Sequence, residues 1–100
     1  MAIKKKPPIL NHHDIRELKD KLHHLKPAIV IDNKGLTDEI FQDIDSALND
    51  FELIKIRTHT DSSEELITIA DEICSKTKAA LVQTIGFIIA IYRKNLLVEE

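Results

Sequence analysis

Apolar residues near the start of the chain recur at helical spacing. In "NHHDIRELKDKLHHLK" (11–26), residues three and four positions apart share one apolar face: Ile15, Leu18, Leu22 and Leu25. The positions one residue further along carry cations or histidine: Arg16, Lys19, His23 and Lys26. With Asn11 as N-cap and Pro27 as terminator, the pattern predicts a helix that packs through one face and turns a basic stripe outward.

The next segments predict a strand, a turn and a second helix. The apolar run "AIVI" (28–31) is typical of a strand covered on both faces. "DNKG" (32–35) predicts a turn, in which Gly35 can adopt positive φ. Thr37 is the expected N-cap of the second helix. The buried face of that helix is expected to comprise Ile40, Ile44, Ala47, Leu48 and Phe51.

Strict alternation follows in "ELIKIRT" (52–58). Ile54 and Ile56 should face one side of a strand, and Lys55 and Arg57 the other. The segment "DSSEE" (61–65) then opens a third helix, with Ser62 and Glu65 in the spacing of a capping box. The core face expected for this helix consists of Leu66, Ile69, Ala70, Ile73 and Cys74.

Two apolar strands, 79–85 and 87–93, meet near Gly86 and predict a tight hairpin. The order α-β-α-β-α-β-β indicates an α/β fold, a two-layer α+β arrangement with a four-stranded mixed sheet and one antiparallel pair at its end. One hundred residues suffice for one core. We expect a flexible basic tail over 1–9, a single domain over 10–95 and a frayed tail over 96–100.

The charge is unevenly distributed, although the net charge is only −3. Residues 1–36 carry eight Lys and Arg against four acids, a balance of +4, and 73–100 have a balance of +2. The segment 37–72 carries two cations against eleven acids, a balance of −9. Basic ends around an acidic middle indicate a charge-polarised domain, provided that the ends meet in the fold.

Several chemistries lack a supporting pattern. The pairs His12-His13 and His23-His24 are separated by more than two helical turns, which favours solvated surface histidines over a zinc site. The single cysteine, Cys74, cannot form an intramolecular disulfide. No phosphate-binding or nucleophile motif is present, so we expect neither an enzyme nor a cofactor. With no apolar run long enough for a membrane span, a cytoplasmic protein is expected.

The turn "DNKGLT" joins a strand to a helix N-terminus, where free backbone N–H groups favour a phosphate. Gly35 allows close approach of the backbone, and Lys34 adds charge. An ordinary strand-to-helix turn has the same appearance, so this signal is weak by itself. The cations of the first helix, the strand 52–58 and the end of the last strand strengthen it if the fold gathers them.

Three blocks carry a family resemblance: "LKPAIVIDNKGLTDEI", "ELIKIRT" and "VQTIGFIIAIYR". Together they resemble the small bacterial YhbY-like proteins, single-domain versions of the CRM domain (chloroplast RNA splicing and ribosome maturation), over about residues 10–95. The resemblance implies a fold like the C-terminal domain of bacterial translation initiation factor three, with an added N-terminal helix. It also implies RNA binding and association with the precursor of the large ribosomal subunit.

The family's turn carries a GxxG, likened to the loop by which KH domains clamp nucleotides. Here it corresponds to Asp32, Asn33, Lys34 and Gly35, so Asp32 replaces the first glycine. Phe87 stands where relatives commonly have a polar or basic residue. Our predicted RNA-binding residues are Arg16, Lys19, Lys26, Asn33, Lys34, Gly35, Lys55, Arg57, Tyr92, Arg93 and Lys94. For Tyr92 the sequence leaves open whether the ring stacks on a base or faces inward with a bonded hydroxyl.

The predicted partner is RNA, in particular ribosomal RNA in precursors of the large subunit, bound by a monomer. The alternative is a protein-interaction module whose acidic helices bind a basic ribosomal protein or an assembly factor. No metal, cofactor or membrane partner is expected.

Overall fold

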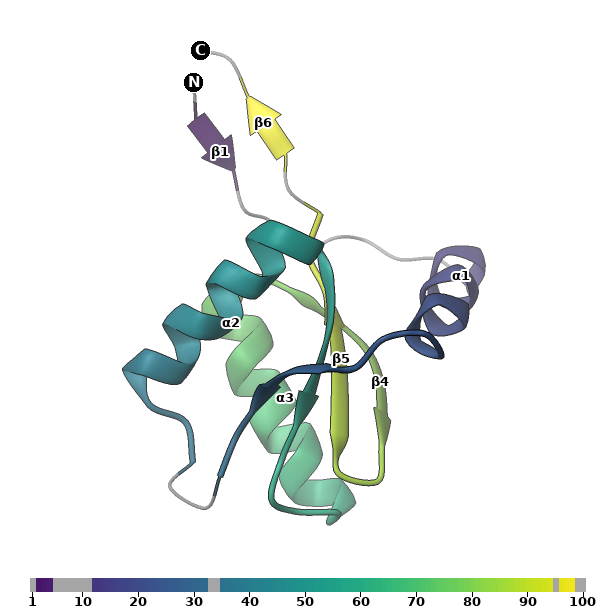
Figure 1. Ribbon diagram of the computed structural model, residues 1–100, viewed down its shortest axis with the longest axis vertical. Coiled ribbons are helices and arrows are strands. Elements are labelled where there is room, and N and C mark those ends of the chain that lie inside the picture. The colour runs from purple at the N-terminus through teal and green to yellow at the C-terminus, as the bar shows by residue number, and fades with distance from the viewer. Residues whose placement is uncertain (1, 5–11, 33–34, 95, 99–100) are drawn as a thin grey trace.

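The computed structural model describes residues 2–4, 12–32, 35–94 and 96–98 (Figure 1). Its elements, in chain order, are β1 (Ala2–Lys4), α1 (His12–Leu22), β2 (Pro27–Val30), α2 (Asp38–Phe51), β3 (Leu53–Arg57), α3 (Ser63–Thr77), β4 (Ala80–Ile85), β5 (Ile88–Tyr92) and β6 (Leu96–Val98). A four-stranded sheet has the order β2-β3-β5-β4. Strands β2 and β3 run parallel, and β5 pairs antiparallel with both β3 and β4. The predicted mixed sheet is therefore confirmed.

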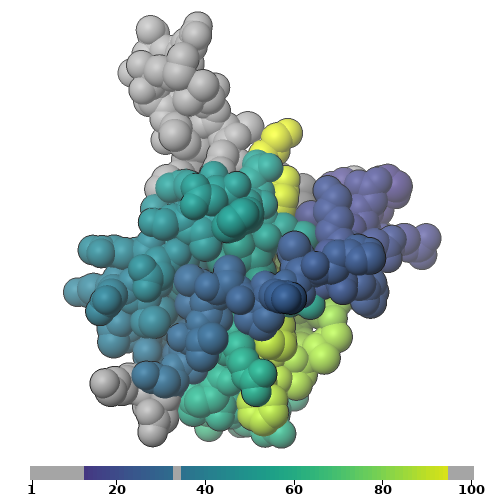
Figure 2. Space-filling model, viewed as in Figure 1, coloured from purple at the N-terminus to yellow at the C-terminus, as the bar shows by residue number. Residues whose placement is uncertain are grey.

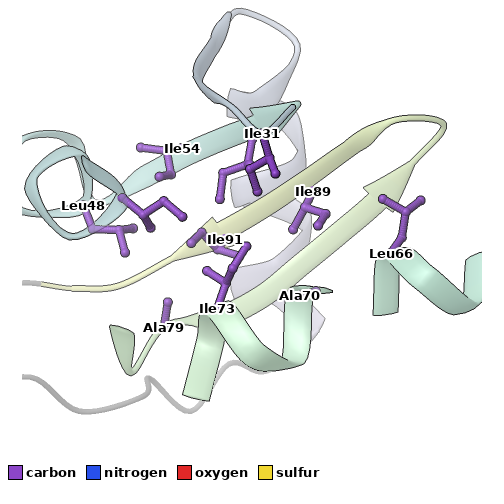
Figure 3. Packing of buried hydrophobic residues seen from close by; sticks show 11 residues of the cluster. Ile31, Leu48, Ile54, Leu66, Ala70, Ile73, Ala79, Ile89 and Ile91 are labelled. Atoms are coloured by element: carbon purple, nitrogen blue, oxygen red, sulfur yellow. The ribbon is translucent and has the colours of Figure 1, made fainter. Parts of the chain in front are cut away.

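One face of the sheet is covered by the acid-rich helices α2 and α3. The alternation predicted for β3 places Ile54 and Ile56 on this face, beside Ile89 and Ile91 of β5. These side chains are at most 2% exposed and form the main core with residues of α2 and α3 (Figure 3). The buried faces predicted for the two helices are confirmed at Ile44, Leu48, Leu66, Ala70 and Ile73.

Helix α1 packs on the opposite face of the sheet. Its apolar side chains Leu18 and Leu22 join Leu53, Val82 and Ala90 in a second buried cluster. Because successive strand residues point to opposite faces, β3 presents Leu53, Lys55 and Arg57 on the α1 side. Figure 1 shows α2 and α3 on one side of the sheet and α1 on the other.

Strand β2 lies at an edge, and the prediction that it is covered on both faces is wrong. Three of its four residues are exposed, and Val30 is 62% exposed. Figure 2 shows this blue segment crossing the surface between α1 and α2. Phe51, predicted to be buried, is 68% exposed because it ends α2 beyond the edge of the core. The apolar composition of the segment 28–31 did not reveal which strand would lie at the edge.

The starts of α2 and α3 differ from each other. At α2 the predicted cap is confirmed, since Oγ1 of Thr37 accepts a hydrogen bond from the Ile40 N–H at 3.2 Å. Ser62 is the N-cap of α3 but makes no side-chain cap hydrogen bond, so the predicted capping box is wrong. Instead, the N–H of Ser62 donates to Oγ1 of Thr60 at 3.1 Å, which fixes the chain before the helix.

The described ends of the chain pair with each other. Strands β1 and β6 form a two-stranded antiparallel sheet, with Ile3 opposite Leu97. The sequence indicated a loose basic tail and a frayed end at these positions, because three-residue strands give too short a pattern to detect. The predicted N-cap Asn11 lies outside the described residues.

Candidate nucleic-acid interface

Lys55 and Arg57 form the centre of the candidate interface. Both project from β3 toward the α1 side of the sheet, two residues apart and therefore about 7 Å from each other along the strand. Nζ of Lys55 donates to the Leu25 carbonyl at 3.0 Å, which ties β3 to the segment that follows α1. An ammonium group has three N–H donors, so two remain for a ligand.

Arg57 connects this face to the predicted phosphate turn. It pairs with Val30 at the end of β2, and its carbonyl accepts from the Ile31 N–H at 2.8 Å. The turn begins one residue later, where the Gly35 N–H donates to the Asp32 carbonyl at 3.0 Å. Arg57 is therefore beside the strand residues that precede the turn, and Lys55 is two residues further from it along β3.

Gly35 has φ +80°, as predicted for this turn. Apart from its chain neighbours, no described residue has an atom within 4 Å of the position that a Cβ would take at Gly35. Gly35 is half-buried, and its lack of a side chain allows a ligand to approach the backbone closely. Asp32 is exposed beside it. The predicted contacts Asn33 and Lys34 lie outside the described residues.

The cations near α1 are exposed, but acids accompany them. Arg16 and Lys19 lie on the solvent side of the helix, and Lys26 lies after its end. Within α1 itself, three cations are balanced by Asp14, Glu17 and Asp20. The described residues contain no ion pair between a carboxylate and any of five cations predicted to bind RNA, of which Lys55 is half-buried and the others are exposed: Arg16, Lys19, Lys26, Lys55 and Arg57.

Arg93 was predicted at the rim of the RNA-binding surface, and this prediction is wrong. Its side chain is completely buried. Nη1 donates at 2.7 Å to both Oδ1 of Asp45 and the Thr77 carbonyl, and Nη2 donates to Oδ1 of Asn49 at 2.8 Å. The guanidinium therefore joins β5 to α2 and α3, and it has no surface on which to contact a nucleic acid.

Tyr92 and Lys94 lie at the other end of the sheet from the turn. Tyr92 is opposite Leu53, the first residue of β3, whereas the turn follows strand positions beside Arg57, about 13 Å further along. The Tyr92 ring packs against the α1 cluster, and burial, together with Glu52 and Asp14, raises the pKa of its hydroxyl. Lys94 is exposed. These residues do not adjoin Arg57 and the turn.

The sheet lies between the two cations of β3 and the acid-rich helices. Lys55 and Arg57 are on the α1 side, whereas the acid-rich helices α2 and α3 cover the other side. An anionic ligand approaching the α1 side therefore meets two cations with the strongly acidic helices behind the sheet. No group of three or more metal-binding side chains occurs in the described part of the chain.

Sequence reasoning missed a hollow on this same face. It has a volume of about 150 Å³ and is lined by Leu22, His23, Lys55, Gln83, Ile85, Ile88 and Ala90. The alternation of apolar and polar positions in β4 and β5 could have predicted that Gln83 and Ile85 share a face, and that Ile88 and Ala90 do. Their position beside Lys55 depends on the register between strands, which the sequence does not supply.

The fold and these features define a small α/β domain with a candidate nucleic-acid interface on one sheet face. The chain belongs to the CRS1/YhbY (CRM) domain family, whose model matches residues 10–93. The resemblance noted in the sequence is thereby confirmed. None of the helices in the described ranges is long and apolar enough to cross a membrane.

Individual relatives bear RNA-binding names. The chain is 35% identical to "Probable RNA-binding protein PA4753" of Pseudomonas aeruginosa over 86% of this chain and 83% of that protein. It is 42% identical to an RNA-binding protein of Haemophilus influenzae over 78% of this chain and 79% of that protein. The solution structure of SAV1595 from Staphylococcus aureus, a candidate RNA-binding protein, is similar with a TM-score of 0.78 at 27% identity, covering 91% of this chain and 95% of that one.

Proposed function

We propose that this chain binds RNA through the α1 side of its sheet. The observation that carries the proposal is the position of Lys55 and Arg57, two cations on one sheet face, with Arg57 leading directly to the turn at Gly35. Cations beside a strand-to-helix turn suit the phosphates of a nucleic acid, which supply most of the affinity. The RNA-binding names of the relatives support the same proposal.

In this proposal Lys55 and Arg57 neutralise adjacent phosphates, and the backbone around Gly35 approaches another. Arg16, Lys19 and Lys26 supply further phosphate contacts from α1 and the segment after it, and Asn33 and Lys34 from the turn. Since these contacts recognise backbone and shape, we expect low sequence specificity. Lys94 lies at the far end of the sheet, so it contacts a phosphate only if the RNA extends past β3.

The proposed ligand is ribosomal RNA in precursors of the large ribosomal subunit, bound by a monomer in the cytoplasm. This part of the proposal rests on the YhbY-like character of the three sequence blocks. The alternative is that α2 and α3, whose exposed faces are rich in acids, bind a basic ribosomal protein or assembly factor.

Crosslinking in cells, followed by sequencing of the attached RNA, tests the proposal when ribosome-gradient fractions are compared. We expect ribosomal RNA fragments from fractions that hold precursors of the large subunit. Association with those particles should vanish after nuclease treatment. Association that survives nuclease, with no crosslinked RNA, would support the protein-binding alternative and refute RNA binding.

A further inference from the structure

The hollow on the α1 side of the sheet arises from the register of three strands. Lys55 of β3 lies opposite Ala90 of β5, which in turn lies opposite Gln83 of β4. This row therefore has a small side chain between two long ones. In the next row, Arg57 lies opposite Ile88, which lies opposite Ile85. The short side chain of Ala90 thus forms the bottom of the hollow, and the longer side chains around it form its sides. Leu22 and His23, at the end of α1, close one side.

The lining combines apolar walls with a few polar groups. Leu22, Ile85 and Ile88 provide apolar surface. Ile85 is 61% exposed and is not part of the main core, so its side chain is accessible to a ligand. Gln83 provides an amide, which can both donate and accept hydrogen bonds. Lys55 places a cation at the margin. A ligand suited to this lining has a flat apolar ring with a polar edge, and it carries a negative charge nearby.

The size of the hollow is that of a single aromatic ring. A cavity of about 150 Å³ lined by apolar side chains accommodates benzene in another protein, and the hollow here has about the same volume. A pyrimidine base fits this volume, whereas the larger double ring of a purine would extend beyond it. A base stacked in the paired interior of a duplex could not enter, so the base must be unpaired.

We propose that the hollow accepts one unpaired pyrimidine of the bound RNA. The ring lies against Ile85 and Ile88, its polar edge meets the Gln83 amide, and its phosphate lies at Lys55 and Arg57. This inference rests on the proposed function and adds to it a preference for RNA with a single extruded nucleotide. A nucleotide is favoured over an apolar protein segment because the hollow shares Lys55 with the cationic interface and adjoins Arg57.

The experiment compares two short RNA duplexes that are identical except for a single bulged uridine in one of them. Wild-type protein should bind the bulged RNA about tenfold more tightly, the effect of placing one base against a protein surface. Gln83→Leu removes the amide and Ala90→Leu fills the floor. Both variants should lose the preference while keeping the affinity for the paired duplex. Ile67→Ala, an exposed apolar site on α3, is the matched control and should keep the preference.

Circular dichroism establishes that each variant is folded, and Gln83→Leu is decisive if Ala90→Leu does not fold. Equal wild-type affinity for the two RNAs overturns the inference and leaves the proposed function standing. Variants that weaken both RNAs equally also overturn it. No binding of either RNA by the wild type refutes the proposed function together with the inference. If these substitutions release a protein partner that resists nuclease while the bulge preference is unchanged, the hollow belongs to that protein and the inference fails.

Discussion

Arg93 and Asp45 form an ion pair of 2.7 Å, in which the arginine side chain is completely buried and the aspartate side chain is 37% exposed. The pair joins the end of β5 to α2, and the Thr77 carbonyl, which also accepts from Nη1, adds α3. Asn49 and the Asp45 carbonyl accept from Nη2. A planar guanidinium can reach all these acceptors at once, whereas an ammonium group cannot.

Removal of this arginine should therefore destabilise the protein. Arg93→Met should lower the free energy of unfolding by roughly 2–3 kcal/mol, because it removes the hydrogen bonds of the guanidinium and leaves the buried Thr77 carbonyl without its donor, whereas Asp45 and Asn49 can be reached by water. Urea denaturation measures the loss. Lys94→Met, the adjacent exposed site, is the control and should change stability by about 0.5 kcal/mol or less. A stable Arg93→Met variant that has lost RNA binding would contradict the structural role assigned here.

Replacing the N-cap residue by alanine should lower the stability of the protein more at α2 than at α3. Thr37→Ala removes the hydrogen bond that Oγ1 accepts from the Ile40 N–H and should cost about 1 kcal/mol. Ser62→Ala removes no side-chain cap bond and should cost a few tenths of that. Thermal unfolding of both variants under one condition gives the comparison. Equal losses would show that the hydroxyl of Ser62 caps α3 in solution.

The buried thiol predicts a decline in stability at high pH. Burial, reinforced by the charge of Asp71, raises the pKa of Cys74 from 9.0 to about 11. Between these values the unfolded chain loses the thiol proton while the folded protein retains it. The contribution of this group is therefore fully present below pH 9 and is lost as the pH rises toward 11.

Cys74→Ala isolates this contribution from the other groups that titrate in the same range. The urea midpoint of the wild type should fall more steeply between pH 9 and pH 11 than that of the variant. Parallel pH profiles would mean that Cys74 titrates alike in the folded and unfolded states.

Salt should weaken RNA binding strongly. If the five cations Arg16, Lys19, Lys26, Lys55 and Arg57 each neutralise one phosphate, log K should fall against log salt with a slope of roughly −3.5 to −4.5. Lys55→Ala should reduce the magnitude of the slope by about one. Fluorescence anisotropy over a salt series measures both slopes. An unchanged slope in the variant would exclude Lys55 from phosphate contact.

Local patterns predicted most of the fold. The helical spacing of Leu18 and Leu22, the alternation of Ile54 with Lys55, and the turn at Gly35 each depend on neighbours in the sequence, and each was correct. The order of the strands depends on contacts between distant segments. The apolar run 28–31 therefore gave no sign that β2 would be an exposed edge strand.

The candidate site was only partly predictable for the same reason. Lys55 and Arg57 followed from alternation along one strand. The segment "IYRKN" made Arg93 appear solvent-exposed, because its acceptors come from Asp45, Asn49 and Thr77, far away in the sequence. The hollow above Ala90 escaped detection because it requires the register of three strands.

In the proposed interface the location of positive charge matters more for RNA binding than its total amount. The double variant Lys55→Glu, Arg57→Glu reverses both cations on the α1 side of the sheet. Lys76→Glu, Lys78→Glu makes the same change in net charge at exposed sites at the end of α3, on the other layer.

The most direct measurement is the dissociation constant of each double variant for one structured ribosomal RNA fragment at a fixed salt concentration. The Lys55, Arg57 variant should bind about a hundredfold more weakly or not at all, while circular dichroism shows that it is still folded. Its urea midpoint should fall slightly, because Lys55→Glu removes the hydrogen bond to the Leu25 carbonyl. The Lys76, Lys78 variant should stay within about threefold of the wild type, since screening weakens charges beyond a Debye length. Unchanged affinity in the first variant, or equal losses in both, would contradict an RNA interface on this face.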